Sequence, residues 1–170
     1  VRLATPGMQI DLGGIAKGYA ADEILATLRK YGVTRALAAV GGDITAGDAP
    51  PDAATWVVAV APLMRAKPMH RLKLVNAAVS TSGDREQFTI IDGVRYSHIV
   101  DPRTGLGQTG RRSVTVIARR GIIADATTKA VALMDVEKAL ELIEETSDAA
   151  ALIVVDEKVR ESKRLATYLK

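Results

Sequence analysis

The sequence predicts an α+β fold in which mixed or antiparallel sheet layers pack against helices. Strand candidates and helical stretches follow one another without the regular alternation of a doubly wound fold. The pair Asp92-Gly93 separates two strand candidates in the way a two-residue hairpin turn does. With 170 residues, 48% of them hydrophobic, the chain can bury the core of one domain. We therefore expect a single domain over residues 1–170.

The elements expected along the chain begin with a helix at residues 15–31. Its apolar residues recur at helical spacing, and Gly32 stands where a left-handed cap would end it. Strand candidates follow at residues 35–40, 55–60, 71–74, 87–91, 94–97 and 113–118. A helical pair is expected at 123–134 and 137–145, and the apolar run 151–155 suits a central strand. The segment 47–54 is expected to be a loop within the domain.

The composition excludes several classes of function. Lys and Arg number 23 against 20 Asp and Glu, with the two signs interleaved, and aromatic residues make up only 4%. Nucleic acid is therefore not an expected partner. The absence of cysteine excludes disulfides and thiolate catalysis. No apolar stretch approaches the roughly 18 residues of a membrane span. No signal peptide is present, and because the chain begins at Val1 we expect that an upstream portion has been removed.

The run from His98 to Gly105 is the most informative motif. It places an imidazole, a carboxylate, a guanidinium and a hydroxyl around a turn in which Pro102 fixes φ. Gly105 can adopt the positive φ that closes such a turn. The arrangement suits an anionic ligand. An ordinary surface turn accounts for the same residue types equally well.

Four further clusters can be interpreted in two ways each. Gly13-Gly14 leads into a helix whose free N–H groups attract phosphate, and Lys17 adds charge there, although a simple tight turn is the alternative. Gly41-Gly42 lets a ligand approach the backbone, or forms a bulge. Residues 80–84 are expected to form a hydroxyl-rich turn that donates to a ligand, or a capping turn. Asp125 is a candidate ligand, or only a charge at a helix N-terminus.

The order and spacing of these motifs resemble the C-terminal portion of the ApbE family, the FAD:protein FMN transferases. The matching stretches are residues 11–22, 41–43, 80–84, 98–105 and 124–126. The resemblance implies an ApbE-like domain that lacks the family's N-terminal part, which contributes to the adenine side of the FAD pocket. It implies an enzyme that uses a divalent cation, usually magnesium, to split FAD. FMN is then joined through a phosphoester to a threonine of a partner flavoprotein, and AMP is released.

The resemblance also implies a location and the roles of individual residues. Family members commonly work in the periplasm, often tethered to the membrane, and any tether would lie outside residues 1–170. Asp125 and the backbone carbonyl of Ala16 would hold the metal, since magnesium prefers oxygen ligands. His98 would orient or deprotonate the incoming threonine. The residues expected around the flavin and its phosphates are Ala16, Lys17, Gly41, Gly42, Ser82, Gly83, His98, Ile99, Asp101 and Arg103. We expect one cavity to join Asp125 and His98, with the bridging phosphates between them.

Three departures from the family pattern bear on activity. The family carries a threonine or serine at the metal site four residues after Asp125, whereas this chain has Lys129. Positions 125 and 129 share a helix face, so the ammonium can pair with Asp125 and occupy the space of the cation. Arg85 stands where the family commonly has an aromatic residue, and Gly107 stands where it often has a proline. A flavin-binding or partner-binding module without catalysis, and a metal-dependent FAD pyrophosphatase, are therefore the alternatives to an FMN transferase.

Overall fold

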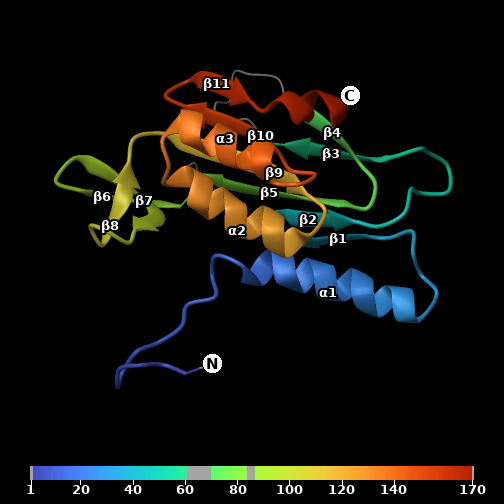
Figure 1. The fold of residues 1–170 in the computed structure, drawn as a ribbon, viewed down its shortest axis with the longest axis horizontal. Helices are drawn as coiled ribbons and strands as arrows, with labels where there is room; N and C mark the ends of the chain where they lie inside the picture. Colours follow the sequence, from blue (N-terminus) through green and yellow to red (C-terminus); the bar gives the residue numbers. More distant parts are fainter. Residues whose placement is uncertain (1, 61–69, 84–86, 170) are drawn as a thin grey trace.

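The computed structural model describes residues 2–60, 70–83 and 87–169 and confirms the α+β class (Figure 1). Its helices are α1 (Ala16–Lys30), α2 (Gly121–Ala132), α3 (Val136–Glu145) and the short 3-10 helix η1 (Lys163–Thr167). Its strands are β1 (Leu37–Val40), β2 (Asp43–Ala46), β3 (Trp56–Val60), β4 (His70–Leu74), β5 (Ala77–Gly83), β6 (Phe88–Ile91), β7 (Val94–Asp101), β8 (Leu106–Thr109), β9 (Arg112–Ala118), β10 (Ala150–Val155) and β11 (Lys158–Glu161). Among the helices of the described residues, none is both long enough and apolar enough to cross a membrane.

The strands form three antiparallel sheets. The main sheet has the order β1-β2-β5-β9-β10-β11, while β3 pairs with β4 and β6-β7-β8 form a third sheet. The predicted turn at residues 80–84 is wrong for residues 80–83, which lie in β5 at the middle of the main sheet. Residue 84 and Arg85 lie outside the described residues. The strand predicted at 151–155 is interior, between β9 and the edge strand β11.

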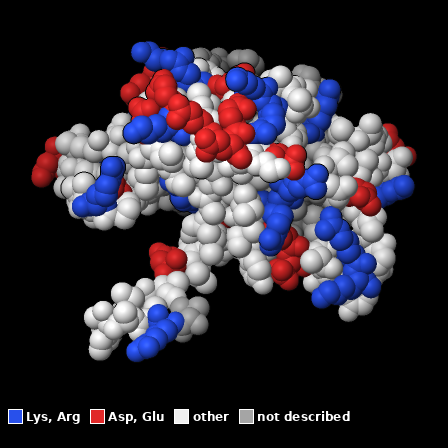
Figure 2. All heavy atoms as spheres, viewed as in Figure 1, with Lys and Arg blue, Asp and Glu red and all other residues white. Residues whose placement is uncertain are grey.

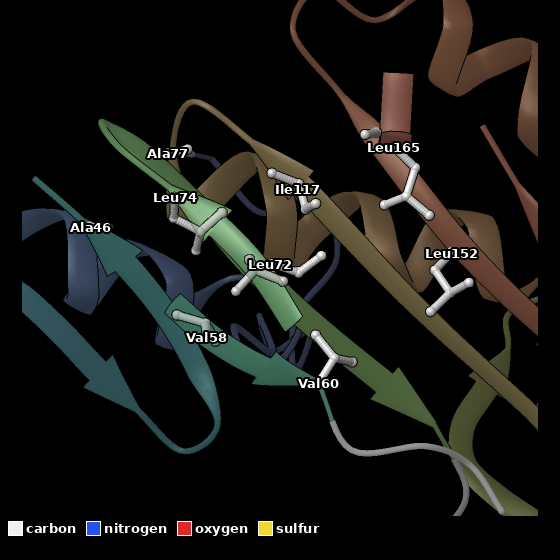
Figure 3. Close-up of a cluster of buried hydrophobic side chains, with 11 residues drawn as sticks. Ala46, Val58, Val60, Leu72, Leu74, Ala77, Ile117, Leu152 and Leu165 are labelled. Carbon is white, nitrogen blue, oxygen red and sulfur yellow. The ribbon is translucent and has the colours of Figure 1, made fainter. Parts of the chain in front are cut away.

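The main sheet separates two hydrophobic clusters. On one face, Val79, Ile117 and Leu152 pack with the β3–β4 hairpin and with Leu165 of η1, as Figure 3 shows for most of this cluster. On the other face, alternate residues of β9 and β10 pack against α2 and α3. Fully burying one such aliphatic side chain contributes about 2 kcal/mol. The sheet is therefore a rigid platform, and the residues at its ends are held in place by both layers.

Helices α1 and α2 cross at a pair of glycines. A Cβ at Gly18 would collide with the carbonyl oxygen of Gly121 and would lie 2.8 Å from the Cβ of Asp125. Asp22 of α1 also accepts hydrogen bonds from the N–H groups of Gly121 (2.6 Å) and Ile122 (3.2 Å), which caps the N-terminus of α2. This cap from another helix explains why α2 begins two residues before the predicted start. The crossing brings the beginnings of both helices together.

Two predicted local features are confirmed, and one segment stands apart. Gly32 has a φ of +80° and ends α1, and Asp92 and Gly93 have φ values of +49° and +77° in the β6–β7 turn. Residues 2–10 are exposed and extend away from the body of the domain (Figures 1 and 2). The face drawn in Figure 2 carries basic and acidic side chains next to one another, as the interleaved sequence predicts.

Candidate functional site

A cavity of about 1070 Å³ lies where the beginning of α1, the β1–β2 turn, β5 and β7 meet. This volume lies just above the usual range for small-molecule sites, about 300 to 1000 Å³. The cavity brings together eight of the sequence-predicted residues, namely Lys17, Gly41, Gly42, Ser82, Gly83, His98, Ile99 and Lys129. Residues that the sequence analysis did not single out also line it, among them Ile44, Gln87 and Ser113. One cavity thus joins the His98 strand to the lysines beside Asp125.

Two of the residues predicted to bind the ligand, Asp101 and Arg103, bind each other and do not line the cavity. The Arg103 guanidinium donates to both oxygens of Asp101, with the shortest N–O distance 2.6 Å, and the Arg103 N–H donates to Oδ1 at 2.9 Å. These bonds lower the pKa of Asp101 to about 2. The turn is satisfied by its own residues, so a ligand-binding role for the pair stays a prediction.

Lys17 lies in the first turn of α1 between two buried carboxylates. Its Nζ is 3.3 Å from Oδ2 of Asp43 and 3.5 Å from Oδ1 of Asp125. Burial disfavours the charged ammonium, but the two carboxylates outweigh that effect and raise the pKa of Lys17. Gly41 makes room for the side chain, because a Cβ there would lie 2.9 Å from Cδ of Lys17. The cation is therefore fixed at the edge of the cavity.

Asp125 is fully buried in α2, behind the cavity wall. Its Oδ1 accepts a hydrogen bond from the Lys129 ammonium, as the spacing of four residues predicts, and its Oδ2 accepts one from the Gly18 N–H at 3.1 Å. Burial alone would raise the pKa of Asp125, but these bonds and the charge of Lys17 lower it. The carboxylate is therefore ionised, with donors on both oxygens.

Asp43 belongs to this cluster although the sequence analysis gave it no role. It is buried at the start of β2, and its Oδ1 accepts a hydrogen bond from Ser80 Oγ at 2.8 Å. Among the described residues, its Oδ2 accepts no hydrogen bond and faces the ammonium of Lys17. Burial raises the pKa of Asp43 despite the hydrogen bond from Ser80. The sequence contained a signal for Asp43, since this residue directly follows Gly41-Gly42. Both glycines have positive φ values and form the β1–β2 hairpin turn, so the alternative of a bulge is wrong.

Hydroxyl groups tie this cluster to the main sheet. Thr128 Oγ1 donates to the carbonyl oxygen of Asp125 at 2.7 Å and lies 2.7 Å from Ser82 Oγ of β5. Ser82 lines the cavity as well. The helix that carries Asp125 and Lys129 is thereby held against the strand that forms the cavity wall.

His98 lies exposed on β7, at the opposite wall of the cavity. Its Nδ1 is 3.1 Å from the carbonyl oxygen of Gln87. Because a carbonyl oxygen can only accept, this bond requires the proton of the neutral imidazole to be on Nδ1. Nε2 then carries the free lone pair and can take a proton from a hydroxyl group.

The donors around Asp125 do not fit a magnesium ion in this arrangement. Magnesium binds oxygen ligands, whereas Oδ1 of Asp125 contacts two ammonium groups and Lys129 has no lone pair while protonated. In the part of the chain that the structure describes, no three His, Asp or Glu residues are grouped for metal binding. Two unit charges about 4 Å apart repel by about 4 kcal/mol at an effective dielectric constant of ~20. A divalent ion beside either lysine would double that repulsion. Ala16, the other predicted ligand, is exposed and does not line the cavity.

Comparison with known proteins adds independent findings. The sequence profile of the ApbE family matches residues 1–153. An FAD:protein FMN transferase of Treponema pallidum is 38% identical over 95% of this chain and 48% of its own length. One of Escherichia coli K12 is 32% identical over 87% of this chain and 43% of its own length. The chain therefore spans about half the length of these curated relatives.

Solved structures show the same similarity. The ApbE protein of Thermotoga maritima superimposes with a TM-score of 0.87 at 34% identity, over 97% of this chain and 55% of that one. The flavin transferase ApbE of Vibrio cholerae gives a TM-score of 0.83 at 29% identity, over 96% of this chain and 54% of that one. The fold is thus shared over almost the whole of this chain and about half of each neighbour.

Proposed function

This chain belongs to the ApbE family, and we propose on that basis that it forms part of an FAD:protein FMN transferase. The reaction would move FMN from FAD onto a threonine of a partner flavoprotein and release AMP. The observation that carries the proposal is that one cavity joins a glycine turn, two lysines and an imidazole. Glycines admit the backbone close to a flat or phosphorylated ligand, and the lysines supply counter-charge to phosphates.

The residues can perform the transfer in one displacement. The threonine Oγ forms a bond to the phosphorus of the FMN moiety, while the bond from that phosphorus to the bridging oxygen breaks and AMP leaves with the oxygen. His98 Nε2 takes the proton of the threonine hydroxyl, with the Nδ1–H held by Gln87. Lys17 and Lys129 offset the charge on the phosphoryl oxygens. Alignment and charge neutralisation are the main demands of this chemistry.

Magnesium and the cellular location are parts of the family expectation that stay predictions. A bound divalent cation would act as a Lewis acid on the diphosphate. The groups around Asp125 do not suit such an ion, because two lysine ammonium groups already contact its carboxylate. A periplasmic location, with any tether outside residues 1–170, is proposed from the family resemblance alone.

The proposal is tested in the host from which the chain comes. Proteins from a strain lacking the gene are denatured and separated, and covalently bound flavin is detected by its fluorescence in the gel. We expect the deletion to remove a fluorescent band, the wild-type gene to restore it, and a gene with His98→Ala to fail. An unchanged band pattern overturns the proposal. Release of free FMN from FAD by the purified protein would then identify a pyrophosphatase, and no product would identify a binding module.

A further inference from the structure

We propose that Lys17 and Lys129 form a built-in cationic site that binds the diphosphate of FAD without a divalent cation. The inference rests on the proposed function, because it takes FAD as the ligand. In this proposal, the two side-chain ammonium groups take the place that the family resemblance assigns to a metal ion between Asp125 and the phosphates.

The two lysines converge although they come from different helices. Lys17 lies in the first turn of α1 and Lys129 in the last turn of α2, yet both ammonium groups contact the same atom, Oδ1 of Asp125. The close crossing at Gly18 makes this possible, because the Gly18 N–H occupies the other oxygen of the carboxylate. Two positive charges are therefore gathered at one point of the cavity wall by the packing of the helices.

The burial of the cluster directs its positive side toward the cavity. The side chains of Lys17 and Lys129 are 36% and 23% exposed, whereas that of Asp125 is 0% exposed and that of Asp43 is 3% exposed. Both lysines line the cavity, and neither carboxylate does. A ligand in the cavity therefore meets the ammonium groups first, while the carboxylates hold those groups in place from behind.

The hydrogen-bonding capacity of the lysines suits phosphate oxygens. Each ammonium has three N–H donors and no acceptor. Lys129 directs one donor to Asp125, and Lys17 faces one oxygen each of Asp43 and Asp125, so donors remain for a ligand. Gly14, in the turn that precedes α1, lies against the Lys129 side chain, with its Cβ position 3.8 Å from Cγ. The diphosphate would thus lie at the two ammonium groups, beside the glycine-rich beginning of α1.

The experiment compares flavin binding with and without magnesium in the full-length protein. Dissociation constants of FAD and of riboflavin, which has no phosphate, are measured by calorimetric titration in EDTA and in magnesium chloride. We expect wild-type protein to bind FAD equally well in both buffers. Lys129→Thr should weaken FAD binding in EDTA about tenfold, because it removes a charge-assisted hydrogen bond, and magnesium should recover part of that loss. Riboflavin binding should not change.

A matched control is Lys30→Met, which removes an exposed lysine from the last turn of α1, away from the cavity lining. It should bind FAD as wild type does. The inference is overturned if wild-type protein binds FAD only with magnesium, or if Lys129→Thr binds FAD in EDTA as tightly as wild type. Thermal unfolding shows whether the variant is folded. If it is not, the comparison of wild-type FAD binding in EDTA and in magnesium chloride still tests the inference. Binding of neither flavin would instead overturn the proposed function itself.

Discussion

Two elements that contribute to the cavity, α2 and β7, each carry a carboxylate paired with a cation, and neither carboxylate lines the cavity, but the surroundings of the two pairs differ. In α2, Asp125 is sealed from solvent and held by lysines from two helices. At the end of β7, outside the cavity lining, Asp101 accepts hydrogen bonds from Arg103 in an exposed turn. A buried charge that loses its partner is costly, whereas an exposed pair contributes little. The same pairing is therefore structural in α2 and nearly dispensable at the end of β7.

The two regions also differ in how far apart their residues lie in the sequence. Around α2, only tertiary packing brings Lys17 and Asp43 to the pair formed by Asp125 and Lys129. The β7 region uses one continuous stretch, from His98 to Arg103. Substitutions in the cluster around Asp125 should therefore reduce the stability of the fold, and those in the β7 region should alter chemistry or local titration. Four predictions test this difference, in order of the expected change in the free energy of unfolding.

Gly18→Ala should have the largest effect. The added methyl group has no space between the Gly121 carbonyl and the Cβ of Asp125, so the helices must separate. We expect a loss of about 3 kcal/mol or more in the free energy of unfolding, measured by urea denaturation. Gly14→Ala is the matched control, because its new Cβ would make only ordinary contact with Lys129. Equal stability of the two variants would contradict the close crossing.

Asp125→Ala should follow, with a loss of about 3 kcal/mol, because it leaves two partly buried ammonium groups without their shared carboxylate. Asp101→Ala is the comparison at the end of β7 and should change the unfolding midpoint far less. Both are measured by urea denaturation at neutral pH. Similar losses for the two variants would mean that burial does not distinguish the two carboxylates.

His98→Ala should leave the free energy of unfolding nearly unchanged, because the side chain is exposed and makes one hydrogen bond. If His98 is the base, the rate of covalent flavin transfer should fall by about 10²-fold or more. The affinity for FAD should change less than the rate. A variant with an unaltered transfer rate would remove the imidazole from the reaction.

Arg103→Ala should have the smallest effect on stability and a clear effect on one titration. The pKa of Asp101, about 2 in the intact turn, should rise toward the ordinary value of an aspartate. Because the pKa is lowered in the folded state, the pair contributes at pH values above the ordinary aspartate pKa and loses its contribution as the pH falls toward 2. Carboxyl chemical shifts followed by NMR across this range check the change. An unshifted titration would show that Arg103 does not hold the carboxylate in solution.

The sequence predicted elements whose signals are local and missed those that depend on distant partners. The α1 helix and its Gly32 cap follow from spacing and from one left-handed residue. Residues 80–83 of strand β5 were predicted as part of a turn because they are rich in hydroxyl groups. In the fold, Ser80 bonds Asp43 of the neighbouring strand and Ser82 bonds Thr128 of a helix, so those hydroxyl groups are satisfied inside the structure. The short strands β2, β8 and β11 were missed for a similar reason, since each pairs within a sheet that a local pattern does not define.

By itself the sequence determined the α+β class, the glycine turns and the pairing of Asp125 with Lys129, because each depends on residues within a few positions of one another. Only the tertiary structure decided that Lys17 and Asp43 join that pair and that Asp101 and Arg103 stay outside the cavity. The physical reason is that burial and convergence depend on the crossing of α1 with α2 and on the strand order of the main sheet. The helix crossing joins residues more than a hundred positions apart, and the sheet pairs β2 with β5, β5 with β9 and β9 with β10 through residues 30 or more positions apart.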